Sequence, residues 1–213
     1  MKKILNEWRQ FINESGLSRI YGHMQEHESA FLSASRGDRH DAEGHCTESA
    51  ISIGVEDGLR NRDLKATLLK AGYGVTATLG AYIENFTSEF AREIKEDSYF
   101  ILNLNDDIDF FDNIKILSEK YCQDSVLLCP KGGVDCFLYG TNNNPYPGYG
   151  EVEVLGHPVF GQEAEFMTRV GGRPISMAEN KQKLKLETYE DLNRQQRMAV
   201  SAIAKRVLND GEN

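Results

Sequence analysis

Residues 98–129 read SYFILNLNDDIDFFDNIKILSEKYCQDSVLLC and hold a strand, a helix and a second strand in close succession. The first seven residues are rich in β-forming side chains, and the aspartates after them favour the start of a helix. One apolar stripe of helical spacing follows, formed by Phe110, Ile114, Leu117 and Tyr121. SVLLC at 125–129 is short and wholly apolar, which is typical of a buried strand. The stretch therefore predicts a β-α-β unit whose helix packs on a sheet.

The segments on either side extend this pattern. SAFLSAS at 29–35 alternates as a half-buried strand does, and 55–70 predicts a helix with acidic residues in its first turn. GVTATLGAYI at 74–83 predicts another strand, and a glycine turn leads into a last one at 135–139. The order β-α-β-β-α-β-β predicts an α+β fold of the ferredoxin-like split β-α-β-β-α-β type, with a mainly antiparallel sheet, extra strands and amphipathic terminal helices.

The composition is that of an ordinary globular chain whose charge is unevenly distributed. The 213 residues carry 24 Lys and Arg against 33 Asp and Glu, a formal net charge of -9, and 40% are hydrophobic. No apolar run reaches the ~20 residues that a membrane span needs. Residues 1–20 and 181–213 are each mildly basic, so the acidic charge lies in 21–180. We expect a leader or docking helix at 1–20, a core domain at 21–180 that is a poor match for nucleic acid, and a basic helical tail at 181–213.

The four cysteines form no CxxC pair, and no N-terminal stretch reads as a secretory signal. Reduced thiols in a cytoplasmic setting are therefore expected. Cys129 and Cys136 lie in apolar runs and are expected to be buried as small hydrophobic side chains.

Histidines and glycines give only weak indications of a cofactor. His23 and His27 are four residues apart, a spacing that places two imidazoles on one helical face where zinc could bind. The sequence between them is HMQEH and not HExxH, which favours an ordinary solvated turn of helix. The ligand-rich loop DRHDAEGHC at 38–46 is interpreted as a solvated connection, and no glycine run has the context of a nucleotide-binding fingerprint. We predict no cofactor and no metal.

Polar side chains beside the predicted strands supply the candidate catalytic residues. These are Arg36, Glu84, Asp124 and Asn142. Strand ends are where a rigid sheet presents functional groups. If Arg36 converged with a carboxylate, an anion clamp beside a general base would suit phosphate or ADP-ribose chemistry. In the alternative, Asp124 caps the turn before its strand and Arg36 forms a surface ion pair.

A second candidate for anion binding is the turn RVGGR at 169–173. Arg169 and Arg173 flank its two glycines and could hold an anion between them. The alternative is a turn with two exposed arginines.

Several segments between residues 29 and 150 form a distinctive set: SAFLSASRG, LRNRDLKATLLKAGYGV, GAYIEN, EDSYFILNL, YCQDSVLL, and LYGTN followed by PGYG. This set resembles an uncharacterised family of proteins from tailed, T4-like bacteriophages with distant bacterial relatives. The resemblance covers more than half of the chain. It implies a phage origin and no particular reaction.

The first fourteen residues, MKKILNEWRQFINE, carry an apolar helical stripe made by Ile4, Trp8 and Phe11. They resemble the capsid-targeting leaders of T4-like phage internal head proteins. The resemblance implies that this helix docks on a head or scaffold protein and that phage protease cuts between Glu14 and Ser15.

These likenesses predict a phage accessory protein that is packaged in the virion head, can be delivered to the host cytoplasm, and acts by binding a protein partner, a host protein included. Two alternatives stay open. One is an enzyme that acts on a nucleotide or phosphate-bearing substrate, and the other is a structural virion component whose basic arms bind partners. The sequence does not decide whether the chain is an enzyme.

Overall fold

The computed structural model describes residues 19–36, 46, 55–84, 92–132, 135–161, 166–170, 172–177 and 182–184. The predicted leader lies outside the described residues, including its stripe residues Ile4, Trp8 and Phe11 and its expected cleavage site between Glu14 and Ser15. Of the predicted tail at 181–213, only 182–184 is described, and it forms a strand. No helix in the described part of the chain is long and apolar enough to cross a membrane.

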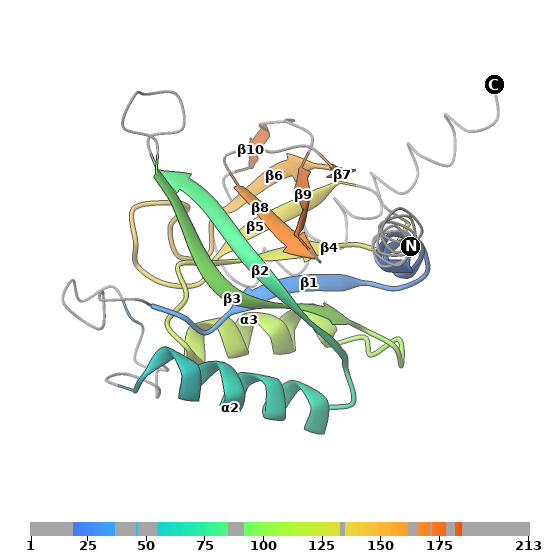
Figure 1. Cartoon of the computed structure of the whole chain (residues 1–213), viewed down its shortest axis with the longest axis horizontal. Helices are drawn as coiled ribbons and strands as arrows, with labels where there is room; N and C mark the ends of the chain where they lie inside the picture. Colours follow the sequence, from blue (N-terminus) through green and yellow to red (C-terminus); the bar gives the residue numbers. More distant parts are fainter. Residues whose placement is uncertain are drawn as a thin grey trace, which may run out of the picture.

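An antiparallel sheet dominates the described chain (Figure 1). Its strands follow the order β10-β6-β5-β4-β1-β3-β2-β8-β9-β7. Their bounds are β1 Ser29–Ser33, β2 Gly74–Glu84, β3 Arg92–Leu102, β4 Ser125–Cys129, β5 Cys136–Gly140, β6 Val152–Gly156, β7 Pro158–Phe160, β8 Phe166–Val170, β9 Arg173–Met177 and β10 Gln182–Leu184.

Two helices, α2 (Asp57–Lys70) and α3 (Phe110–Lys120), cover one face of the sheet (Figure 1). The apolar stripe predicted for α3 points inward, with Phe110, Ile114 and the following Tyr121 buried in the core. Leu64 and Leu68 of α2 join the same core, which lies against inward-facing residues of β1, β3, β4 and β5. Alternation along each strand therefore gives one helix-facing row of side chains and leaves a second row for the other face.

The second face has an apolar core of its own. A helical segment at 19–26 buries Ile20 and Met24 there, beside Phe31 of β1 and Phe100 of β3. Ile175 of β9 belongs to the same core, although β9 is far from β1 in the strand order. The sheet therefore curls into a barrel-like arrangement, and Figure 1 shows β8 and β9 crossing over β4 to β6.

The predicted order of elements from β1 to β5 is confirmed, but the ferredoxin-like fold is wrong. A sheet with helices on one face needs a cover on the other. Here the sheet supplies that cover itself, because it continues past β4 through β5, β6 and β10 and past β2 through β8, β9 and β7. The strands that form this cover fall mainly within 152–177.

Candidate functional site

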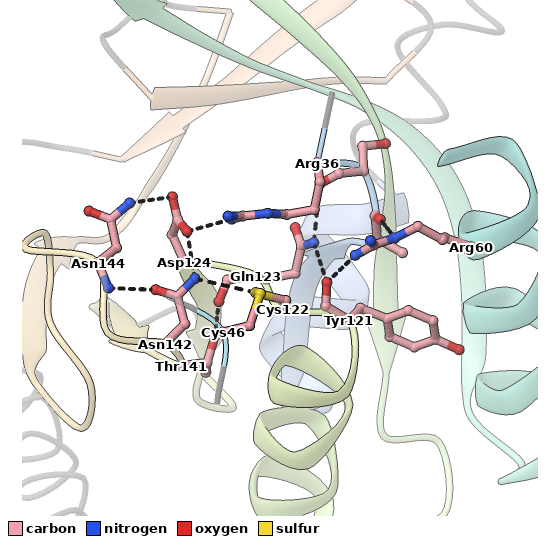
Figure 2. Close-up of a disulfide and its surroundings, with 12 residues drawn as sticks. Arg36, Cys46, Arg60, Tyr121, Cys122, Gln123, Asp124, Thr141, Asn142 and Asn144 are labelled. Atoms are coloured by element: carbon pink, nitrogen blue, oxygen red, sulfur yellow. Dashed lines mark hydrogen bonds and ion pairs between the residues drawn. A yellow bond between two sulfur atoms is a disulfide. The ribbon is translucent and has the colours of Figure 1, made fainter. Parts of the chain in front are cut away.

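Three of the four candidate catalytic residues meet at one end of β4 (Figure 2). Arg36 donates from Nη1 to Oδ1 of Asp124 at 2.6 Å, and Asn142 donates from Nδ2 to the same oxygen at 2.7 Å. Asn144 donates to the second carboxylate oxygen at 2.8 Å. The antiparallel pairing of β1 with β4 explains this meeting, because the end of β1 then lies beside the start of β4.

The chain segment that carries Arg36 is fixed from several sides. Asn61 of α2 accepts from the backbone N–H of Ala34 at 3.0 Å and donates to the hydroxyl of Ser35 at 2.8 Å. Arg60, its neighbour on α2, donates to the carbonyl of Ala34 at 2.7 Å and also to the carbonyl of Tyr121. Buried backbone groups after β1 therefore find partners in side chains, which makes residues 34–36 a firmly positioned connection.

A disulfide between Cys46 and Cys122 borders the cluster (Figure 2). Asn142 lies against its sulfur, with 3.9 Å between Nδ2 and Sγ of Cys122. A second disulfide joins Cys129 to Cys136 across the turn between β4 and β5. The expectation of reduced thiols is therefore wrong, although Cys129 and Cys136 are buried as predicted.

The remaining candidate residues lie elsewhere. Glu84 is the last residue of β2 and pairs with Arg92 at the outer end of the β2–β3 hairpin; its side chain falls outside the described residues. Arg169 and Arg173 lie on β8 and β9, where Arg169 faces Pro174 and Arg173 faces Val170 in the register.

The cluster around Asp124 has the geometry of a clamp. The carboxylate accepts two hydrogen bonds at Oδ1 and one at Oδ2. A carboxylate offers about four acceptor sites, so these donors take most of them and favour a positioning role over proton transfer. The side chain of Arg36 is only 9% exposed, and its Nε has no hydrogen-bond partner among the described residues.

The inner side of the curled sheet lines an open cavity of about 180 Å³. Most of its lining is apolar and comes from both sides of the strand order: Phe31, Leu127, Leu138, Leu155, Met167, Ile175 and Met177. Its polar residues are Ser33, Glu96, Ser98, Ser125 and Thr168. They form the polar end of the cavity, because the register places Ser33 opposite Ser98 and places Gly80 between Glu96 and Thr168. Ser125 directly follows Asp124, but successive strand residues point to opposite faces, and no side chain of the clamp lines the cavity.

Two tyrosine–aspartate pairs on the helix-covered side of the sheet have shifted pKa values. Burial, and then a 2.7 Å hydrogen bond to Asp107, raise the pKa of Tyr73 to about 12. The same hydrogen bond holds the pKa of Asp107 below its usual range. Burial and a hydrogen bond to Asp63 likewise raise the pKa of Tyr121. These pairs connect loops and helices, and they lie outside the cavity lining.

Sequence reasoning did not single out Arg60 and Asn61 of α2, although both are buried. The sequence did indicate that Arg60 is buried, because Arg60, Leu64 and Leu68 recur every four residues and therefore share one helix face. Asn144 was also missed. It lies in a run of three consecutive asparagines, where the sequence does not show which of them bond to Asp124.

Comparisons of the chain with family models, with curated proteins and with solved structures find no match. The phage resemblance therefore stays a prediction from the sequence.

Proposed function

We propose that the barrel-like domain binds a small molecule in the cavity between β1, β3, β4 and β8–β9. One observation carries this proposal: strands from both ends of the sheet order line a cavity that is mostly apolar and holds its polar residues at one end. Ligand sites typically combine an apolar lining with a few placed polar groups. The apolar lining and the polar end of the cavity together favour a ligand with an apolar body and one polar group.

The size of the cavity limits the size of the ligand. An apolar cavity of ~150 Å³ is large enough for a benzene molecule. The cavity of about 180 Å³ therefore suits a single ring or a short branched chain with one substituent.

The polar end favours a ligand that donates a hydrogen bond. The hydroxyl of Ser33 already donates to the carbonyl of Asp97 at 2.8 Å, and that of Thr168 donates to the carbonyl of Leu79 at 3.4 Å. A hydroxyl that has used its proton can still accept through a lone pair. We therefore propose a ligand with a hydroxyl or amino group, such as a small phenol or amine.

The test is a titration of the full chain with p-cresol, followed by NMR of ¹³C-labelled methionine methyl groups. The signals of Met167 and Met177, which line the cavity, should shift and saturate. Met167→Trp should fill the cavity and abolish the shift of Met177. Ile116→Trp, at an exposed position on α3, is the matched control and should leave the titration unchanged.

Toluene separates the two parts of the proposal. It has the same ring and methyl group as p-cresol but no donor, so it should bind more weakly, because one hydrogen bond contributes ~0.5–1.5 kcal/mol. Equal shifts in Met167→Trp and in the unaltered chain would show that p-cresol binds elsewhere. No saturable shift with either compound would refute a site of this chemistry.

We also propose that the chain is a phage accessory protein that is packaged in the virion head and delivered to the host, where it binds a protein partner. The leader-like segment at 1–14 and the phage-like segments between 29 and 150 support this proposal. Mass spectrometry of purified virions tests it. The protein should be present and begin at Ser15; its absence, or persistence of residues 1–14 on it, would contradict packaging through this leader.

A further inference from the structure

Three potential metal ligands lie together on the helical segment at 19–26 and its last turn. His23, Glu26 and His27 each offer one ligand atom, and these atoms lie within 4.8 Å of one another. The helical bond from the N–H of His27 to the carbonyl of His23, at 2.8 Å, continues the helix through this turn. Ile20 and Met24 are buried on the neighbouring side of the segment, which fixes the direction of the three ligands.

The surroundings of His27 give a second, independent indication. Its Nδ1 is buried and has no hydrogen-bond partner among the described residues. Oδ1 of Asp106, from the connection between β3 and α3, lies 3.9 Å away. Metal-bound histidines usually donate their second ring N–H to a carboxylate or carbonyl, which fixes the ring and the tautomer. A small movement of the exposed Asp106 side chain would bring its carboxylate into that role, and Nε2 of His27 is then left for a metal.

We propose that His23, Glu26 and His27 form a binding site for a divalent transition metal of the zinc class. Two imidazoles and one carboxylate match the ligands that Zn²⁺ takes in proteins, whereas Mg²⁺ and Ca²⁺ prefer oxygen ligands alone. Three protein ligands leave one tetrahedral position for water. The site is independent of the cavity proposal, because none of its residues lines the cavity.

HMQEH lacks the HExxH pattern but still brings three ligands together. Glutamate three residues after the first histidine lies on the same helix face as both histidines, because positions i, i+3 and i+4 are neighbours.

The test is calorimetric titration of the full-length chain, without an affinity tag, with ZnCl₂. One equivalent should bind at this site. Loss of a partner that hydrogen-bonds to a metal ligand typically weakens metal binding ~10- to 100-fold, and Asp106→Asn should fall within that range. His23→Gln and His27→Gln each remove a ligand and should weaken Zn²⁺ binding by more than that. His157→Gln, at an exposed position, is the matched control and should bind as the unaltered chain does.

The loop at 38–46 contains the other two histidines, so the double variant His40→Gln/His45→Gln is required. It should retain the high-affinity site, and loss of that site in this variant would overturn the proposal. Because a variant can misfold, Zn²⁺ binding is also followed by NMR in the unaltered chain. Long-range ¹H–¹⁵N spectra of the imidazoles should show ZnCl₂ shifting His23 and His27 first; first shifts at His157 or at the loop histidines would also overturn it.

Discussion

Replacing Asp124 with Asn tests the clamp that joins the ends of β1, β4 and β5. The substitution keeps the shape of the side chain but removes its charge and turns one oxygen into an NH₂ donor. Arg36, Asn142 and Asn144 all donate to Asp124, so the new NH₂ group faces donors. A hydrogen bond to a charged group contributes ~1.5–3 kcal/mol, and removing one partner of a buried ion pair costs ~3–5 kcal/mol.

The exposure of Arg36 and Asp124 decides where between ~1.5 and ~5 kcal/mol the expected loss of stability lies. The side chain of Arg36 is 9% exposed, but that of Asp124 is 33% exposed, so water partly compensates the loss. We expect a fall of about 2–3 kcal/mol in the free energy of unfolding, or about 5–10 °C in Tm for a chain of this size. Lys120→Met, which breaks the more exposed pair with Asp63, should cost less than ~1 kcal/mol.

Urea unfolding followed by circular dichroism measures both variants. A double-mutant cycle with Arg36→Met separates the ion pair from the two asparagine contacts, since residues in direct contact couple by ~0.5–3 kcal/mol. The reasoning is refuted if Asp124→Asn unfolds within ~0.5 kcal/mol of the unaltered chain, or if Arg36 and Asp124 show no coupling energy.

Three further predictions address the rest of the fold. Cys46→Ser removes a disulfide that joins residues 76 positions apart, which should cost about 4 kcal/mol in non-reducing urea unfolding; an unchanged midpoint would show that this bond does not form in solution. Gly140→Ala places a Cβ against a backbone carbonyl of the facing loop and should prevent stable folding, whereas Gly58→Ala meets open space on α2 and should gain up to ~1 kcal/mol; thermal melts compare the two. The raised pKa of Tyr73, about 12 against the usual 10, means that the folded state keeps a proton that the unfolded state releases. Its contribution to stability should therefore be complete below pH 10 and be lost as the pH rises toward 12, and Tyr73→Phe should lose less stability over that interval in alkaline urea unfolding.

Local periodicity was sufficient for the helices and the first five strands, because each buries one face and therefore repeats every two or every three to four residues. It was insufficient for the second half of the sheet. β7 is only three residues long, and β8 pairs with β2, with Met167 opposite Ala81. A pairing across more than eighty positions depends on how the sheet curls, and a short strand between glycine turns carries little periodic signal.

The site was predictable in its residues but not in its contacts. Arg36, Asp124 and Asn142 stand at strand ends, where the sequence placed its candidates. Their convergence follows from β1 lying between β3 and β4, which is a property of the strand order. Arg60 was missed because its charge argued for an exposed position, although its spacing from Leu64 argued for a buried one. The Cys46–Cys122 pairing was missed because partners that lie 76 residues apart leave no local pattern. The Cys129–Cys136 pairing, across seven residues, was missed because reduced thiols were expected.

The clamp and the cavity depend on the same two strands. Asp124 directly precedes Ser125 of β4, and Arg36 follows Ser33 of β1 by three residues, while both serines line the polar end of the cavity. Holding Arg36 against Asp124 therefore fixes the spacing of β1 and β4 where a ligand's polar group would lie. An apolar cavity does not fix its own entrance in this way, because dispersion contacts have little directional preference whereas charge-assisted hydrogen bonds do. The polar cluster that the sequence suggested as catalytic thus has a sufficient physical role in holding the ends of the strands that line the proposed binding site.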